Sequence, residues 1–161
     1  MDRRTSAHNV AAMQFLELNQ IDEWCTEHGI AELNRHAPVL LTRAYGKSVT
    51  PPGQEADVAV AVVDALGEWD ECLLWIEEWG VWPSSEDWPK FYAARGAHGE
   101  RRSLENAPGH LFSWNERPDL IQFLQLVLEN AWNAEIVQLA QPPNGKRAFV
   151  SHDEYVDVFT A

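Results

Sequence analysis

The side chains best suited to acid–base chemistry in this sequence are two histidines near turns and carboxylates. His110 follows a Pro-Gly pair at the start of an expected strand, and His152 precedes Asp153 in the run Ser-His-Asp-Glu at 151–154. A histidine beside a carboxylate can act as a general acid–base pair or as a metal ligand. If His110, His152 and Asp153 converged, they would form the catalytic site of a small hydrolase or metal-dependent enzyme.

Each of these residues also has a simpler structural interpretation, which we favour. Ser151 and Glu154 match the S-x-x-E capping box that begins a helical turn, and this would leave His152 and Asp153 on a surface. His110 is interpreted as a histidine that satisfies backbone hydrogen bonds. The enzyme is therefore kept as the alternative function.

Cys25 and His28 stand three residues apart and could face one metal ion on a helix. A structural zinc site needs about four ligands, and no second pair of this kind is present, so no metal site is expected. Cys25 has no local signature of a nucleophile, and we expect Cys25 and Cys72 to be free, buried thiols. The sequence lacks G-x-G-x-x-G and P-loop motifs, so we expect no cofactor.

The segment from Ser48 to Pro89 combines tryptophan with acidic residues. It contains no Lys, Arg or His, but ten of the acidic residues and five of the eight tryptophans. Tryptophan anchors ringed by carboxylates suit a basic protein surface, because aromatics dominate interface energetics and charge steers the encounter. The alternative is a core role for the tryptophans, with the acids as a solvated rim. The predicted binding residues are Trp79, Trp82, Trp88, Glu77, Glu78, Glu86 and Asp87.

A formal net charge of −13 narrows the classes of partner. Such a surface repels nucleic-acid phosphates and anionic lipids, so we expect no nucleic acid and no membrane partner. The leading hypothesis is an acidic protein-binding module for a basic protein partner, such as a small bacterial inhibitor that neutralises a toxin. A homodimer is a further alternative, in which the acidic segment meets a basic cluster of Lys90, Arg95, His98, Arg101 and Arg102.

Local patterns predict an α+β (mixed α/β) fold, with a sheet of four to six strands and helices packed on it. Residues 1–14 are predicted to be a flexible segment and residues 15–161 a single globular domain. The segment 71–79 also fits a helix face, but a strand that is apolar on both sides is favoured. Helices are expected over 18–28, 54–66, 84–94 and 118–132; strands over 38–42, 71–79, 110–114, 136–140, 148–150 and 155–159; loops over 46–53 and 96–108.

Three short motifs resemble those of a group of uncharacterised bacterial proteins. They are WGVWPSSE at 79–86, APGHLF at 107–112 and VSHDE at 150–154, and together they cover roughly the C-terminal half of the chain. The resemblance implies a bacterial origin and supplies no function. The N-terminal Met1-Asp2-Arg3-Arg4 is followed by polar residues where a signal peptide needs an apolar run, so a cytoplasmic location is expected.

Overall fold

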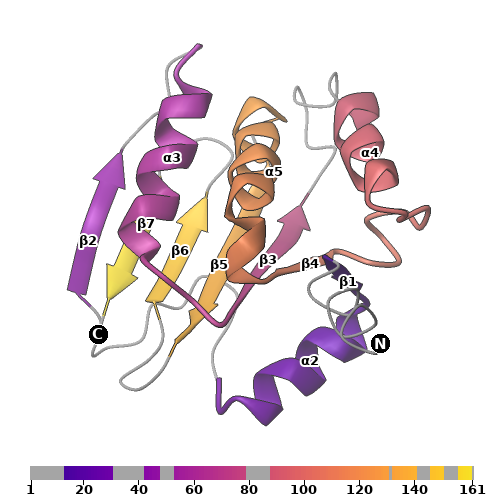
Figure 1. The fold of residues 1–161 in the computed structure, drawn as a ribbon, viewed down its shortest axis with the longest axis horizontal. Coiled ribbons are helices and arrows are strands. Elements are labelled where there is room, and N and C mark those ends of the chain that lie inside the picture. Colours follow the sequence, from indigo (N-terminus) through magenta and orange to yellow (C-terminus); the bar gives the residue numbers. More distant parts are fainter. Residues whose placement is uncertain are drawn as a thin grey trace, which may run out of the picture.

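The computed structural model describes residues 13–30, 42–47, 53–78, 88–130, 132–140, 146–150 and 156–160 (Figure 1). The N-terminal part of the expected strand over 38–42, the expected helix cap at Ser84 or Ser85, and the capping box at 151–154 lie outside these residues. Met13 and Gln14, which were assigned to the flexible N-terminal segment, lie within them. Met13 is buried, and Gln14 pairs with Leu111.

The described strands form one antiparallel sheet in the order β1-β4-β3-β5-β6-β7-β2. The α+β fold class is confirmed, and the described residues supply seven strands instead of four to six. One of them, β1, has three residues, too few to show a period-two pattern in the sequence. The strands are β1 (Gln14–Leu16), β2 (Thr42–Lys47), β3 (Glu71–Glu78), β4 (Gly109–Phe112), β5 (Asn133–Leu139), β6 (Lys146–Val150) and β7 (Val156–Thr160).

The helices begin and end close to the positions that the sequence predicts. Gly29 and Gly67 follow two of them with φ angles of 70° and 71°, a backbone conformation that glycine adopts without steric cost. None of the helices in the described ranges has the length and apolar character needed to cross a membrane. The helices are α2 (Leu18–Glu27), α3 (Glu55–Leu66), α4 (Trp88–Ala97) and α5 (Arg117–Asn130), with a 3-10 turn, η1 (Trp114–Glu116).

Several expected boundaries were wrong. Helix α4 continues to Ala97, into the expected loop over 96–108, and β5 begins at Asn133, before the expected start at Ile136. Gly46 and Lys47 belong to β2 and not to a loop, because their backbones pair with β7. The expected strand over 110–114 ends at Phe112, since a capping box begins η1. The backbone N–H of Ser113 donates to Oε1 of Glu116 at 2.9 Å, so an S-x-x-E pattern acts as a capping box here, immediately before α5.

Strand β3 lies in the middle of the sheet and is covered on both faces. Leu74 and Ile76 pack into the core beneath the helices, whereas Leu73 packs into a second core on the opposite face. This two-sided burial confirms the strand predicted over 71–79. It also explains why the middle of this strand is a continuous apolar run, without alternating polar residues.

Helices α3, α4 and α5 cover one face of the sheet (Figure 1). Phe91 of α4 and Phe123 of α5 meet edge to face with ring centroids 5.3 Å apart, and Phe91 also contacts Trp132. All three side chains are fully buried, and burial of each large apolar side chain contributes roughly 2–3 kcal/mol. This face therefore holds the larger part of the core.

Helix α2 packs on the other face of the sheet. Its inward residues Ile21, Trp24 and Cys25 join a smaller core with Leu73, Leu111, Val137 and Leu139 of the central strands. The helix approaches closely at Gly109 of β4, where a Cβ atom would lie 3.0 Å from both Ile21 and Leu16. The candidate site lies at the interface between α2 and the sheet.

Candidate functional site

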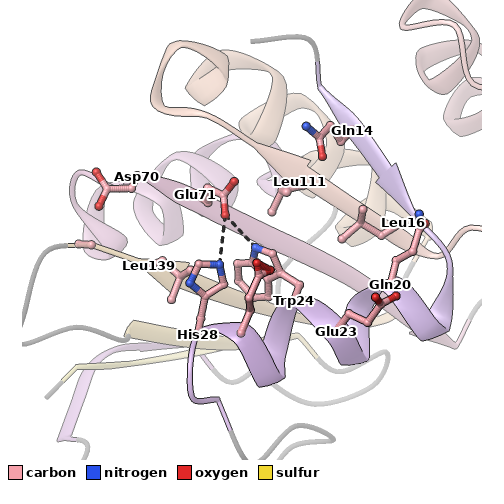
Figure 2. Close-up of a pocket in the computed structure, with 12 residues that line it drawn as sticks. Gln14, Leu16, Gln20, Glu23, Trp24, His28, Asp70, Glu71, Leu111 and Leu139 are labelled. Carbon is pink, nitrogen blue, oxygen red and sulfur yellow. Dashed lines mark hydrogen bonds and ion pairs between the residues drawn. The ribbon is translucent and has the colours of Figure 1, made fainter. Parts of the chain in front are cut away.

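A groove of about 720 Å³ lies between α2 and the strands β1, β4, β3 and β5 (Figure 2). Its volume falls within the range typical of ligand sites, roughly 300–1,000 Å³. Among the described residues, its lining holds four carboxylates, one histidine and no Lys or Arg. The lining residues are Gln14, Leu16, Gln20, Glu23, Trp24, Glu27, His28, Asp70, Glu71, Leu111, Leu139 and Ala140.

Glu71 faces two aromatic rings, that of Trp24 in α2 and that of His28 directly after this helix (Figure 2). The indole Nε1–H of Trp24 donates to Oε1 of Glu71 at 2.8 Å, and Nε2 of His28 lies 3.6 Å from the same oxygen (Figure 2). The Trp24 and His28 rings are in contact, with centroids 5.2 Å apart. The Glu71 side chain is 42 % exposed, so its carboxylate is held in place by the indole while it still faces solvent.

Helix α2 carries an unfavourable distribution of charge. It contains no Lys or Arg, and Glu23 and Glu27 stand four residues apart on its exposed side. Like charges at this spacing destabilise a helix by about 0.2–0.5 kcal/mol, and a carboxylate in the last turn also opposes the helix dipole. A cation bound in the groove would relieve both effects.

The structure locates the predicted binding residues only in part. Trp79, Trp82, Glu86 and Asp87 lie outside the described residues, and Trp88 is described only as the first residue of α4. Glu77 is half-buried. Glu78 is exposed and accepts a hydrogen bond from the side-chain amide of Asn133. A binding role for these seven residues stays a prediction.

Two other tryptophans of the acidic segment are described. Trp69 is only 4 % exposed and packs edge-on against Trp114, while Trp75 is half-buried in the smaller core. The same segment supplies Asp70 and Glu71 to the groove, but the aromatic wall comes from Trp24, which lies 47 residues before Glu71.

His110 is fully buried in the helix-covered core and bonded at both ring nitrogens. Its Nδ1 lies 3.2 Å from the carbonyl oxygen of Leu74, so Nδ1–H donates there and Nε2 accepts from Arg95 Nη1 at 2.8 Å. Burial and the neighbouring positive charge of Arg95 lower the pKa of His110 to about 3. Both ring nitrogens of His110 are therefore engaged inside this core, and His110 is not part of the groove lining. His152 and Asp153 lie outside the described residues.

Arg95 is the cation at the centre of this buried network. It donates to the carbonyl oxygens of Ala107 at 3.0 Å and Arg102 at 2.9 Å, and its guanidinium lies 5.2 Å from the centroid of the Phe15 ring. Burial lowers the pKa of Arg95. The network joins α4, the loop that follows it and β1.

The basic cluster proposed for a homodimer is largely engaged within the chain. Arg95 is buried, and Arg102 binds Glu100 at 2.7 Å and Glu17 at 3.2 Å. Hydrogen bonds from Arg102 hold the pKa of Glu100 at about 2. The acids that balance Arg102 therefore come from outside the segment 48–89. Lys90 and Arg101 are exposed.

Cys25 and His28 face different surroundings on α2. Cys25 points into the smaller core, where burial raises its pKa to about 11, and His28 lies beside Glu71. Burial raises the pKa of Cys72 as well, and both cysteines are free. Within the described ranges, no group of three or more His, Cys, Asp and Glu side chains is placed to hold a metal ion.

Comparisons with models of known protein families, with curated proteins and with solved structures give no match to this chain. The resemblance of its three motifs to uncharacterised bacterial proteins stays a hypothesis.

No local pattern in the sequence predicts the groove. Trp24 and His28 stand about one helical turn apart, a spacing that also fits the buried face of an ordinary helix.

Proposed function

We propose that this chain is a protein-binding module whose groove receives a basic segment of a partner protein. The observation that carries the proposal is a groove lined by Glu23, Glu27, Asp70 and Glu71, with no Lys or Arg among the lining residues that the structure describes. Carboxylates bind ammonium and guanidinium groups through charge-assisted hydrogen bonds, which are the stronger class of hydrogen bond.

The uncharged part of the groove suits the same kind of ligand. Leu16, Leu111 and Leu139 supply apolar surface beside the carboxylates, and Trp24 forms part of the wall. Lysine and arginine side chains have long apolar stems that pack on such surface while the charged head reaches a carboxylate. The groove therefore matches both parts of a basic side chain.

The charge of the whole chain supports a basic partner as well. A net charge of −13 would attract a basic protein over a distance of about one Debye length, roughly 8–10 Å, and raise the rate of encounter. A small inhibitor that neutralises a basic toxin is the form of this function that we expect.

The test is the affinity of the full chain for a fluorescent arginine-rich peptide, measured by anisotropy. We expect Glu71→Gln to weaken binding about 10-fold, because a charge-assisted bond to an anchored carboxylate is lost. The matched control is Glu105→Gln, which removes the same charge from an exposed residue outside the groove lining. Equal losses in both variants, or no binding by the wild type, would contradict the proposal.

A further inference from the structure

The position of His28 connects the groove to pH. Its Nε2 lies 3.6 Å from the Glu71 oxygen that also accepts the Trp24 indole N–H. The His28 side chain is 35 % exposed, so it can exchange protons with solvent without unfolding the helix. Histidine is the residue type whose charge normally changes between about pH 5 and 8.

We propose that the groove is a proton-linked binding site in which a proton on His28 and a cation of the partner compete for Glu71. This inference rests on the proposed function, because it concerns the same groove and the same basic ligand. Glu71 is its specificity-determining residue, and His28 is a positioning residue that controls how much of the Glu71 charge is available.

The surroundings of His28 define the direction of the effect. The titratable groups described near it in the groove are all carboxylates, and they come from α2, from the start of β3 and from the residue just before β3. They are Glu23, Glu27, Asp70 and Glu71, while β1, β4 and β5 contribute only uncharged residues, namely Gln14, Leu16, Leu111 and Leu139. Within the described part of the lining, His28 is therefore the one side chain that can add positive charge.

When His28 is neutral, it does not offset the charge of Glu71, and the indole N–H of Trp24 is the hydrogen-bond donor described on that carboxylate. When His28 is protonated, it forms an ion pair with Glu71 and reduces the negative charge of the lining by one. An incoming ammonium or guanidinium group must then displace that pair. Binding should weaken as the pH falls, and binding at intermediate pH should release a proton.

The size of the effect follows from the exposure of the pair. A solvent-exposed ion pair contributes about 0.2–1 kcal/mol, and a factor of ten in affinity corresponds to about 1.4 kcal/mol. Loss of one charge from the lining adds to the cost of displacing the pair. We expect the affinity for an arginine-rich peptide to fall about 3- to 10-fold between pH 8 and pH 5.5.

The experiment measures the affinity of the full chain for this peptide across that pH range in the wild type and in His28→Gln. Glutamine keeps a polar side chain at the end of α2 but cannot gain a proton. We expect His28→Gln to bind with nearly constant affinity over the range. The control His98→Gln, which alters a histidine beside Asp119 and outside the groove lining, should keep the wild-type dependence.

A second measurement needs no variant. Calorimetric titrations near pH 6.5 in buffers with different ionisation enthalpies report the protons released on binding, and we expect a net release from the wild type. Binding with no pH dependence and no proton release would overturn this inference and leave the proposed function standing. Wild type that fails to bind the peptide at any pH would overturn both.

Discussion

At the scale of single residues, His110 and Arg95 show how two polar side chains are accommodated in an apolar core. An unpartnered buried charge is costly, and so is each buried donor or acceptor without a hydrogen bond. The two terminal nitrogens of Arg95 meet this requirement with backbone carbonyl oxygens and with the acceptor nitrogen of His110, whereas its Nε has no hydrogen-bond partner among the described residues. His110 must stay neutral for this arrangement. Protonation of Nε2 would replace the acceptor that Arg95 needs with a donor and would place a second positive charge beside the guanidinium.

The first residue-scale prediction concerns the dependence of stability on pH. The folded-state pKa of His110 is lowered to about 3 from its ordinary value of 6.5, so in acid the unfolded chain binds a proton that the folded chain does not. The stabilisation is complete above about pH 6.5 and is lost as the pH falls toward 3. We expect the free energy of unfolding in urea to fall by about 1.4 kcal/mol per pH unit between about pH 6 and 4.

The variant His110→Gln tests the assignment of this slope. Glutamine can donate to Leu74 and accept from Arg95 without titrating, so the slope between pH 6 and 4 should become shallower by about one proton. His98→Gln is the control, because His98 is exposed on the surface beside Asp119. If both variants keep the wild-type slope, His110 is not the group responsible.

At the scale of elements, the close approach of α2 to the sheet determines the shape of the groove. Gly109 of β4 allows it, because any side chain there would meet Ile21 and Leu16 at 3.0 Å. Leu16 of β1 and Trp24 of α2 both line the groove. The absence of one Cβ atom thus fixes the distance between helix and strand.

Gly109→Ala tests this contact. We expect it to lower the free energy of unfolding by about 1–3 kcal/mol, because overpacking forces side chains or backbone to move. Displacement of α2 should also weaken binding of the arginine-rich peptide. The matched control is Gly96→Ala in α4, where a Cβ meets nothing within 4 Å and alanine should stabilise the helix by about 0.5–1 kcal/mol. Equal effects of the two substitutions would contradict this account of Gly109.

At the scale of the whole molecule, the main core and the candidate site lie on opposite faces of the sheet. The face beneath α3, α4 and α5 carries the larger core and the buried Arg95–His110 network. The face beneath α2 carries the smaller core and the groove. A change in the groove can therefore alter binding with little effect on the main core, which is why glutamine variants of Glu71 and His28 are suitable probes.

The net charge of −13 leads to a prediction about binding kinetics. If charge steers the basic segment toward the groove, the association rate constant should fall steeply as salt is raised, while the dissociation rate constant changes less. Stopped-flow fluorescence with the arginine-rich peptide measures both. A glutamate-rich peptide of equal length should not bind. An association rate that is independent of salt would argue against steering.

Much of the fold could be predicted because its signals are local. The helices over 18–28 and 54–66 are marked by apolar spacing and by a glycine at their ends, and both are confirmed as α2 and α3. The strand over 71–79 is confirmed because a segment buried on both faces has to be apolar throughout. The short strand β1 could not be predicted, since three residues carry no pattern and pairing with β4 creates the strand.

The candidate site depends on contacts that no local pattern records. The sequence by itself determined that the chain is acidic and that its carboxylates are concentrated in one segment, because composition and charge do not depend on folding. Tertiary structure alone decided which of them share a groove with an aromatic wall, since Trp24 and Glu71 are 47 residues apart and meet only because α2 packs against β3. The physical reason is that periodicity reports which side of an element is buried, whereas a site depends on which elements are neighbours.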